Sequence, residues 1–408
     1  MSYPSFSSAE FERRNRLASE LMKANDLQAL VLFGNSGMNR HNQANVFWLS
    51  NYLDWHHAYL VFPLHGEPTL FNSLINHVPN ARLISVIPDT RWGTYDPATE
   101  IAAQLKKSGI SRGRVGLVGV NATFDMGMPY QHFASLCASL PEIEWADVTR
   151  DFARLRFIKS EEEFAWLQIA AEYTDATVAA LEAEVKPGMT EHNLIGIIEA
   201  AYRGRGGQPH LSYLRSMPMD APTACVPSQN VTDRVIQRGD VIIMEISASY
   251  WGYSGQIQRP IAVGQDPTPE WQRLFDIGVQ AFERICAVMK PGSNEGDVIR
   301  ASALIGEAGY RIYDDLIHGF GVDIQPPLID QHCVKYWSAV LNPALSTDES
   351  SAIPAGRQIL KDMAVVVQPN PITSDERMGL QVGGLTRICD HGAVSLQHFP
   401  LKFVVARG

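Results

Sequence analysis

Hydrophobic positions along the chain follow two periods, one helical and one strand-like. Between residues 9 and 25 the apolar residues Phe11, Leu17, Leu21 and Met22 fall on one face, which predicts an amphipathic helix. Short apolar runs follow and predict strands at residues 29–33, 46–49, 59–62, 83–86 and 115–118. Strands that alternate with helical stretches are typical of an α/β domain, and we expect this one to close near residues 145–148.

A basic segment, residues 151–160, leads into a second and longer amphipathic pattern, which predicts a helix over residues 161–185. Three glutamates begin this helix, where negative charge suits the helix dipole. A chain of 408 residues is too long for one hydrophobic core, so two domains are expected. We place them at residues 1–152 and 153–408.

The second half contains a weak internal repeat. The segment KPGMTE at residues 186–191 is echoed by KPGSNE at residues 290–295, and each precedes an apolar helical stretch, residues 194–201 and 298–305. Short Pro-Gly turns recur by chance, but the matching helices favour a duplication. Strands are predicted at residues 241–247, 255–263, 363–367 and 379–382. We therefore expect a curved antiparallel sheet with helices on one face.

Composition narrows the class of protein. The formal net charge of −10 disfavours nucleic acid or an anionic membrane surface as a partner. No stretch approaches ~18 apolar residues, so no membrane-spanning helix is expected. The N-terminus lacks the pattern of a signal peptide, and five scattered cysteines suit free thiols in a reducing compartment. We expect a cytoplasmic protein without a nucleotide cofactor, since no glycine-rich phosphate loop is present.

Five segments of the second half occur in a characteristic order: LRFIKSEEEF from residue 155, RGDVIIMEISASYWGYSGQIQRP from 238, LIHGFGVDIQPP from 316, MAVVVQPNP from 363 and LQVGGLTRI from 380. In these segments the chain resembles the creatinase/aminopeptidase P family, whose catalytic domain has the pita-bread fold. The first ~150 residues resemble that family's N-terminal domain, a usual domain size. The resemblance implies an α/β (α+β) protein, with a creatinase-like domain followed by a pita-bread domain, that forms a homodimer.

The family's two-metal site takes two aspartates, one histidine and two glutamates. At these positions the sequence has Glu245, Gln256, His318, Gln368 and Gly383, with Gly384 an equal match for the last. Hard divalent ions need carboxylate oxygens to neutralise them, and two amides and a glycine do not supply that charge. The alignment therefore predicts no two-metal site and no metal cofactor.

The retained carboxylate and imidazole are the candidate catalytic groups. Glu245 lies in an apolar strand, where a carboxylate is either paired or has a raised pKa, unless it faces solvent. Metal-free ectoine hydrolases have a glutamate in a similar context, and this resemblance implies Glu245 as nucleophile or general base. His318 precedes a glycine and is interpreted as a proton carrier or substrate ligand; a purely structural histidine is the alternative.

Several further residues are candidates for substrate binding. Gln256 and Gln368 either bind a polar substrate through their amides or hydrogen-bond each other. Arg259 either binds a substrate carboxylate or pairs with an acidic neighbour. Ser228 stands where the family often has a histidine, as does Gln325 in a later segment, and both changes argue against creatinase activity and proline-peptide cleavage.

Two aromatic groups complete the candidates. Trp55 and His56, with His57, lie on a loop that in creatinase-like dimers reaches the partner's active site, so the resemblance implies a substrate lid; an ordinary exposed loop is the alternative. Tyr253 belongs to an aromatic cluster with Tyr250 at a predicted hairpin turn, where it either packs or stacks on a ligand.

The sequence therefore favours a metal-independent hydrolase that cleaves a C–N bond of the amidine, guanidino or amide type in a small polar metabolite. Two other functions stay open. One is a catalytically inactive pseudo-peptidase that binds a peptide or partner protein, and the other is a metal-free lyase or isomerase that uses the same cavity.

Overall fold

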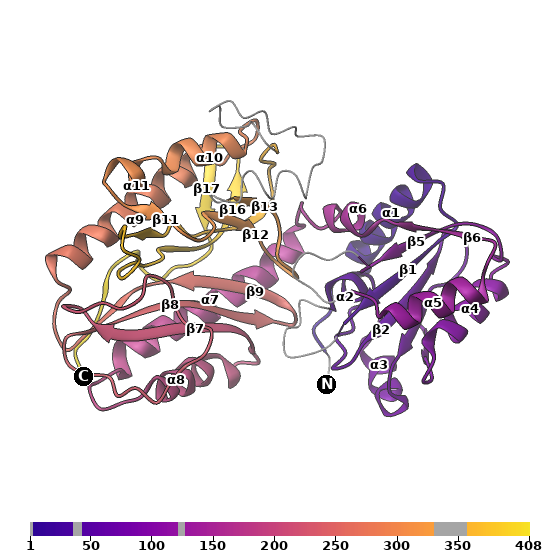
Figure 1. Ribbon diagram of the computed structural model, residues 1–408. Helices are drawn as coiled ribbons and strands as arrows, with labels where there is room; N and C mark the ends of the chain where they lie inside the picture. Colours follow the sequence, from indigo (N-terminus) through magenta and orange to yellow (C-terminus); the bar gives the residue numbers. More distant parts are fainter. Residues whose placement is uncertain (1–2, 36–42, 121–126, 330–356) are drawn as a thin grey trace. The chain divides into compact units, whose positions relative to one another are not determined.

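The chain folds into two compact units, which Figure 1 shows in the computed structural model. The structure describes residues 3–35, 43–120, 127–329 and 357–408. The units are Met1–Arg156 and Phe157–Gly408, so the division falls a few residues after the predicted boundary at residue 152.

The first unit is built on a six-stranded mixed sheet. Its strands are β1 (Ala29–Gly34), β2 (Ala58–Pro63), β3 (Thr69–Asn72), β4 (Asp89–Trp92), β5 (Gly113–Val118) and β6 (Ile143–Asp147), in the order β4-β3-β2-β1-β5-β6. Its helices are α1 (Ser8–Ala24), α2 (Ala44–Ser50), η2 (Ile75–His77), α3 (Val78–Ile84), α4 (Pro97–Lys107), α5 (Tyr130–Ser139) and α6 (Thr149–Arg154). Apolar residues of β1, β2 and β5 form one core with residues of α4 and α5, as expected of an α/β domain.

Two of the predicted strands in this unit were wrong. Residues 46–49 lie in α2, and residues 83–86 lie at and after the end of α3. Val46, Phe47, Trp48 and Leu49 are all buried, and a run of four buried apolar residues shows no periodicity that separates helix from strand. The second run fails for a different reason, since Leu83 is exposed rather than buried.

The second unit is built on a larger and mostly antiparallel sheet of ten strands. The main path runs β13-β12-β14-β16-β9-β8-β10-β18, with β7 paired to β8 and β17 to β16. These strands are β7 (Gln208–Pro218), β8 (Asp240–Tyr250), β9 (Tyr253–Gln258), β10 (Ile261–Val263), β12 (Ile317–Gly319), β13 (Gln325–Ile329), β14 (Ala364–Val367), β16 (Gly383–Cys389), β17 (Gly392–Ser395) and β18 (Val404–Ala406). A separate pair is formed by β11 (Arg311–Ile312) and β15 (Pro371–Ile372).

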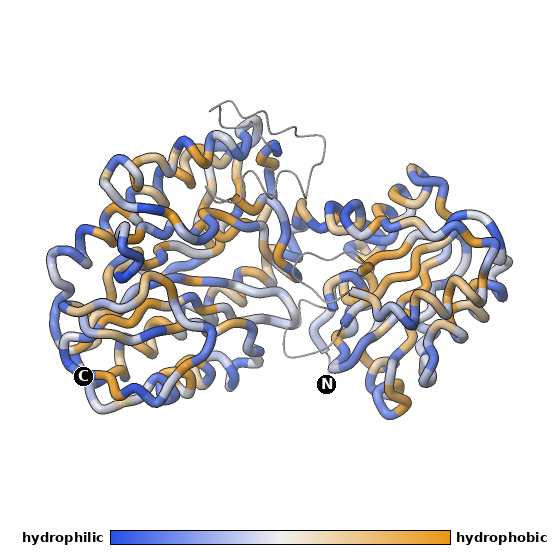
Figure 2. Tube along the Cα trace, viewed as in Figure 1, coloured by the Kyte–Doolittle hydropathy of each residue, from blue (hydrophilic) through white to orange (hydrophobic). Residues whose placement is uncertain are grey.

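The helices of this unit pack against the sheet through two apolar clusters. They are α7 (Glu161–Glu184), α8 (Glu191–Arg203), α9 (Pro269–Val288), α10 (Glu295–Ser302) and α11 (Leu304–Glu307). One cluster joins α7 and α8 to β8, and the other joins α9, α10 and α11 to β12 and β14. Figure 2 shows hydrophobic residues gathered along the central strands of each unit and hydrophilic residues on outer helices and loops.

Strand boundaries near the carboxyl end differ from the predicted ones. The predicted strand at residues 255–263 is two strands, β9 and β10, because Pro260 cannot donate to the sheet. Residues 379–382 precede β16 rather than forming a strand. No helix among the described residues is both long and apolar enough to span a bilayer.

The predicted duplication is visible in matching local structure. Gly188 and Gly292 both have φ of 92°, a left-handed conformation that favours glycine. Each turn is followed by a capping box, at Thr190 in the first copy and Asn294 in the second. Both capping residues also form an isolated β-bridge with a later segment. The two halves of the unit thus use the same device to attach a helix N-terminus to the sheet region.

The first copy of this device holds a buried carboxylate. Glu191 is buried, and its two oxygens accept hydrogen bonds from the backbone and hydroxyl of Ser216, at 2.7 and 2.8 Å, and of Thr232, at 2.8 and 2.9 Å. Burial opposes ionisation of Glu191, but these four hydrogen bonds outweigh it and lower the pKa of the carboxyl. Glu191 therefore ties helix α8 to strand β7 and to the loop before β8.

We expect Glu191→Ala to lower the free energy of unfolding by about 2–4 kcal/mol, because it leaves buried backbone donors unpaired. Glu199→Ala is the matched control on the same helix, since its ion pair with Arg203 is exposed, and we expect a loss below about 1 kcal/mol. Urea unfolding followed by circular dichroism measures both. A lowered folded-state pKa also means that the contribution of Glu191 is present above pH 4.5 and is lost on acidification. Equal losses for the two variants would contradict this role.

Candidate active site

Polar side chains from several strands meet on one face of the large sheet. Side chains alternate between faces along a strand, so Glu245 and Ser247 of β8 share a face, and Gln256 of β9 is paired with Ser247. The other members come from neighbouring strands and the segments that adjoin them. The cluster, called here the polar site, comprises Glu245, Gln256, Gln258, Asp314, Asp315, His318, Gln368 and Gln381.

Two side-chain amides hold the carboxylate of Glu245. Gln256 Nε2 donates to Glu245 Oε1, and Gln381 Nε2 lies 3.5 Å from Glu245 Oε2. Burial of the carboxyl raises its pKa to about 7, although the positive charge of His318 and the two amides oppose the shift. Glu245 stays partly accessible. Glu245 is therefore a half-buried residue whose carboxyl ionises near neutral pH, which suits a base or a nucleophile.

Both ring nitrogens of His318 face acceptors. Nδ1 lies 2.8 Å from Asp315 Oδ2, and Nε2 lies 3.2 Å from Gln256 Oε1. The NH₂ end of Gln256 faces a carboxylate, so its oxygen must face the ring, and both ring nitrogens then need a proton. Burial disfavours this charge, but the carboxylate of Asp315 outweighs it, and the pKa of His318 is raised. The histidine is thus held as an imidazolium.

The glutamines of the polar site hydrogen-bond one another. Gln368 Oε1 accepts from Gln256 Nε2 at 3.2 Å and from Gln258 Nε2 at 2.7 Å, and Gln368 Nε2 donates to Asp315 Oδ1 at 3.1 Å. Of the two roles left open for Gln256 and Gln368, this geometry favours the mutual hydrogen bonds. These amides orient Glu245 and His318 from behind.

Sequence reasoning missed Asp314, Asp315 and Gln381. Gln381 Nε2 donates to Asp314 Oδ2 at 3.0 Å as well as lying near Glu245. Burial raises the pKa of Asp314 to about 8, and the negative charges of Asp315 and Glu245 add to the shift. The only available signal was the pair Asp314–Asp315 three residues before His318, and its closeness to Glu245 depends on strand pairing.

Arg259 and Tyr253 do not belong to the polar site. Tyr253, Gly255 and Ile257 form the opposite face of β9, where a Cβ on Gly255 would lie 2.6 Å from the backbone of Ala170 in α7. Tyr253 is fully buried there, and its hydroxyl donates to Glu163 Oε1 at 2.7 Å. The interpretation of Tyr253 as a substrate ligand is therefore corrected to a packing role.

The guanidinium of Arg259 is bound by backbone carbonyls. It donates to the oxygens of Pro400, Gln258, Gly383 and Phe399 at 2.6–3.3 Å. Burial lowers the pKa of Arg259 to about 10. With its donors used in this way, Arg259 fixes the chain around β16 rather than binding a substrate carboxylate, which corrects the predicted role.

Strand β7 contributes Tyr213 to the face of the sheet that carries the polar site, whereas Ser228 lies in a turn elsewhere. Tyr213 is paired with Glu245 across β7 and β8, so it lies on the same face. Burial raises the pKa of Tyr213, and the nearby Glu245 adds to the shift. Ser228 instead forms a turn, in which its hydroxyl donates to the Asn230 carbonyl at 2.7 Å. No contact of Ser228 with the polar site is seen within the described ranges.

Trp55 and His56 lie in the first unit, on a turn organised by the buried Asp54. Asp54 Oδ1 accepts from the backbone of Trp55 at 2.7 Å and of His56 at 3.1 Å, and from the ring of His77 at 2.8 Å. Trp55 itself is 61% exposed. Hydrogen bonds to the buried Asp54 therefore fix the backbone of this turn, and the side chain of Trp55 projects from it into solvent.

The residues at the polar site do not fit the two metal ions of the related family. Gln256 Nε2 donates to Glu245 and Gln368, and Gln368 Nε2 donates to Asp315, so at these two family positions amides stand in place of the carboxylates that would bridge two cations. At Gly383, one of the two matches for the fifth position, a Cβ would lie 1.8 Å from the Val367 carbonyl oxygen, and at Gly384, the other, 2.6 Å from Gln397 Oε1. Among the described residues, no group of three or more histidine, cysteine, aspartate or glutamate side chains has metal-binding geometry.

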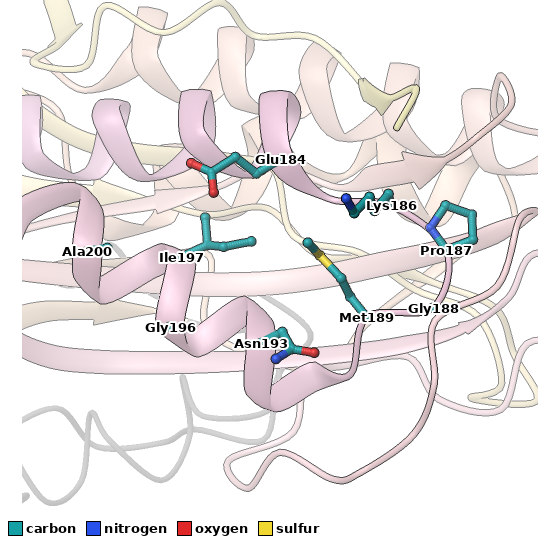
Figure 3. A pocket seen from close by; sticks show the side chains of 9 residues that line it. All are labelled: Glu184, Lys186, Pro187, Gly188, Met189, Asn193, Gly196, Ile197 and Ala200. Atoms are coloured by element: carbon teal, nitrogen blue, oxygen red, sulfur yellow. The ribbon is translucent and has the colours of Figure 1, made fainter.

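A separate surface pocket of about 660 Å³ lies between the end of α7 and helix α8. Figure 3 shows Glu184 and Lys186 on one side of it, Asn193 and Ile197 of α8 on the other, and Met189 in the connecting turn. None of the polar-site residues lines this pocket. We assign it no role in the chemistry of Glu245.

Comparison with known proteins gives two adjacent family matches. Residues 13–158 match the Creatinase/Prolidase N-terminal domain, and residues 165–394 match Metallopeptidase family M24. An uncharacterised peptidase of Bacillus subtilis, YqhT, is 25% identical over 282 residues, which cover 68% of this chain and 72% of YqhT. A Xaa-Pro dipeptidase of Pyrococcus furiosus is 30% identical over 191 residues, 46% of this chain and about half (53%) of the dipeptidase.

Solved structures extend the likeness of fold to nearly the whole chain. An X-Pro aminopeptidase from Thermotoga maritima superposes with a TM-score of 0.77 at 17% identity, covering 96% of this chain and 99% of the other. A prolidase from Pyrococcus horikoshii superposes with a TM-score of 0.76 at 19% identity, with the same coverage. At such identities the likeness shows the fold alone, and it confirms the predicted pita-bread architecture.

The close approach of the Val367 carbonyl to Gly383 can be tested by adding a side chain at this position, where the related family can carry a metal ligand. We expect Gly383→Ala to lower the free energy of unfolding by at least about 2 kcal/mol, because the new Cβ meets a carbonyl and φ is 152°. Gly196→Ala in α8 is the control, since nothing lies within 4 Å of a Cβ there, and it should be neutral or stabilising by up to about 1 kcal/mol. Calorimetry compares the two. A Gly383→Ala protein of unchanged stability would mean that this position has room for a side chain.

Proposed function

The chain belongs to metallopeptidase family M24, and from this premise we propose that it is a hydrolase that works without the metal ions of that family. The observation that supports this most is the carboxylate of the half-buried Glu245, held by two amides at a family ligand position. A carboxyl with a pKa of about 7 is matched to proton transfer at neutral pH. Relative to the family's metal ligands, Gln256 and Gln368 replace carboxylates with amides, while Glu245 keeps a carboxyl group.

The proposed reaction is hydrolysis of a C–N bond at a carbonyl-type carbon. Glu245 removes a proton from a water molecule that attacks this carbon, or attacks the carbon itself to form an acyl intermediate that water then cleaves. The C–N bond breaks, and the nitrogen leaves as an amine after gaining a proton. The imidazolium of His318 is fixed by Asp315 and contacts the oxygen of Gln256, whose NH₂ group orients Glu245.

For the substrate we propose a small polar metabolite with an amidine, guanidino or amide group. A second candidate is an Xaa-Pro dipeptide, which is favoured by the named activity of the Pyrococcus furiosus relative. Both have a C–N bond at a carbonyl-type carbon, so both suit the chemistry of Glu245. The inactive pseudo-peptidase and the metal-free lyase or isomerase remain the rival functions.

We further propose a cytoplasmic homodimer in which Trp55 and His56 of one subunit cover the polar site of its partner. The support is the exposure of Trp55 on a turn ordered by Asp54, together with the family resemblance. No nucleic acid or membrane partner is proposed, in keeping with the net charge of −10.

Removal of metal should leave this protein unchanged. We expect less than about one tenth of a metal ion per purified chain by elemental analysis. Dialysis against a chelator should leave the melting temperature unchanged, because the donor set does not hold a stabilising cation. Stoichiometric metal, or a lower melting temperature after chelation, would contradict the metal-independent proposal.

Glu245→Gln should abolish hydrolysis, with a loss of kcat of at least about 100-fold, because the amide cannot accept a proton. The assay is amine release from a panel of Xaa-Pro dipeptides, N-acyl amino acids, cyclic amidines and guanidino acids, with H₂¹⁸O to show oxygen transfer into product. In the parent protein kcat/KM should rise with pH through about 7, as Glu245 ionises. Glu307→Gln, on the exposed surface of α11, is the control and should retain full activity.

The panel also separates the rival functions. Product without ¹⁸O would indicate a lyase or isomerase. Binding without turnover of any panel member would indicate a pseudo-peptidase. Full activity of Glu245→Gln would eliminate the proposed mechanism itself.

A further inference from the structure

The proton that the leaving nitrogen needs has no evident route through His318. Its side chain is only 6% exposed, and its two ring nitrogens face Asp315 and Gln256. A general acid must come within hydrogen-bonding reach of the atom that it protonates. His318 is therefore buried, and both of its ring nitrogens are already engaged by protein groups.

Asp314 meets this requirement better than His318 does. It is partly accessible, as Glu245 is. One oxygen, Oδ2, accepts from Gln381 Nε2 at 3.0 Å, and the same nitrogen lies 3.5 Å from Glu245 Oε2. The other oxygen, Oδ1, accepts from the backbone of Asp315 at 2.8 Å. The shared amide of Gln381 therefore bridges the carboxyl groups of two half-buried residues, Asp314 and Glu245.

We propose that Asp314 and Glu245 form a carboxyl pair, in which Asp314 donates the proton to the leaving nitrogen. This inference rests on the proposed hydrolase function and moves the proton-transfer role from His318 to Asp314. Gln381 is then a positioning residue, because it touches both carboxyl groups and sets their spacing.

The charges around the pair support this division of roles. Burial raises the pKa of Asp314 to about 8, and Asp315 and Glu245 contribute. The pKa of Glu245 is raised to about 7, with His318 opposing the shift. Tyr213 faces Glu245 from β7 and carries no charge at neutral pH, since its own pKa is raised. Neighbouring carboxyl groups whose environments separate their pKa values can serve as acid and base in one reaction.

The step balances without any further reactant. Glu245 takes one proton from water, and the water oxygen forms a bond to the carbonyl-type carbon. The C–N bonding electrons go to nitrogen, which receives the proton of Asp314 as the bond breaks. The products are an amine and either an acid from an amide, an amide from an amidine or a urea from a guanidino group, and the proton held by Glu245 returns to Asp314 through solvent.

Asp314→Asn tests the pair on the full-length protein. We expect kcat to fall at least about 100-fold on the panel substrate while KM changes by less than about threefold, because the proton donor acts in the transition state. The fall of kcat/KM at high pH, which reports the acid, should disappear, and Asp314→Glu should recover part of kcat. Asp297→Asn is the matched control, since Asp297 caps α10 and is hydrogen-bonded to Asn294 and Arg300 instead.

A readout that needs no substrate accompanies the assay. Infrared spectroscopy at neutral pH should show protonated-carboxyl absorption that weakens in Asp314→Asn and is unchanged in Asp297→Asn, with the remainder coming from Glu245, whose pKa is about 7. An unchanged band, or an Asp314→Asn protein with parental kcat and pH profile, would overturn the role of Asp314. These results differ from failure of the hydrolase proposal, in which Glu245→Gln and Asp314→Asn would both be as active as the parent.

Discussion

The side-chain amide of Gln256 sets the protonation pattern on which the rest of the polar site depends. Its NH₂ group faces Glu245 and Gln368, and its oxygen faces His318. An amide has fixed donor and acceptor ends, so this one position makes the histidine a donor and the glutamate an acceptor. An aspartate at the same place could not donate to Glu245, and the two carboxylates would repel each other unless a cation lay between them.

The other substitutions fit the same electrostatic logic. Gln368 accepts hydrogen bonds from Gln256 and Gln258 and donates one to Asp315. It therefore provides partners for polar groups that would otherwise be buried without a hydrogen bond. Asp315 provides the negative charge that holds His318 as an imidazolium. Hydrogen bonds and a single ion pair thus stabilise a cluster of charged and polar groups on an M24 fold. The price of this arrangement is a raised pKa at Glu245 and at Asp314.

The scaffold around the cluster is held by devices that lie away from the chemistry. Arg259 binds four carbonyl oxygens and fixes the start of β16 beside β9. Glu191 joins α8 to β7 and to the loop before β8. Gly383 lets β16 approach Val367 closely enough to leave no room for a side chain. These contacts fix the strands that carry Glu245, Gln256 and His318, and so preorganise the site.

The sequence by itself determined the two-domain plan, the pita-bread fold and the duplication, because each follows from the order of motifs along the chain. It also identified Glu245 and the loss of ligand residues at Gln256 and Gln368, since residue type alone decides which atoms can bind a cation. The strand prediction at residues 46–49 failed because a run of four buried residues has no readable period, and the one at residues 83–86 failed because Leu83 is exposed.

Only the tertiary structure decided which face of a strand each residue occupies and which side chains meet. Tyr253 proved to lie on the opposite side of β9 from Gln256, where α7 covers the strand, and Arg259, just after β9, proved to be bound by backbone carbonyls. Asp314 and Gln381 reach Glu245 through pairing between strands far apart in sequence. Hydrogen-bond partners and pKa shifts depend on distances of a few ångströms across the sheet, and spacing along the chain does not contain them.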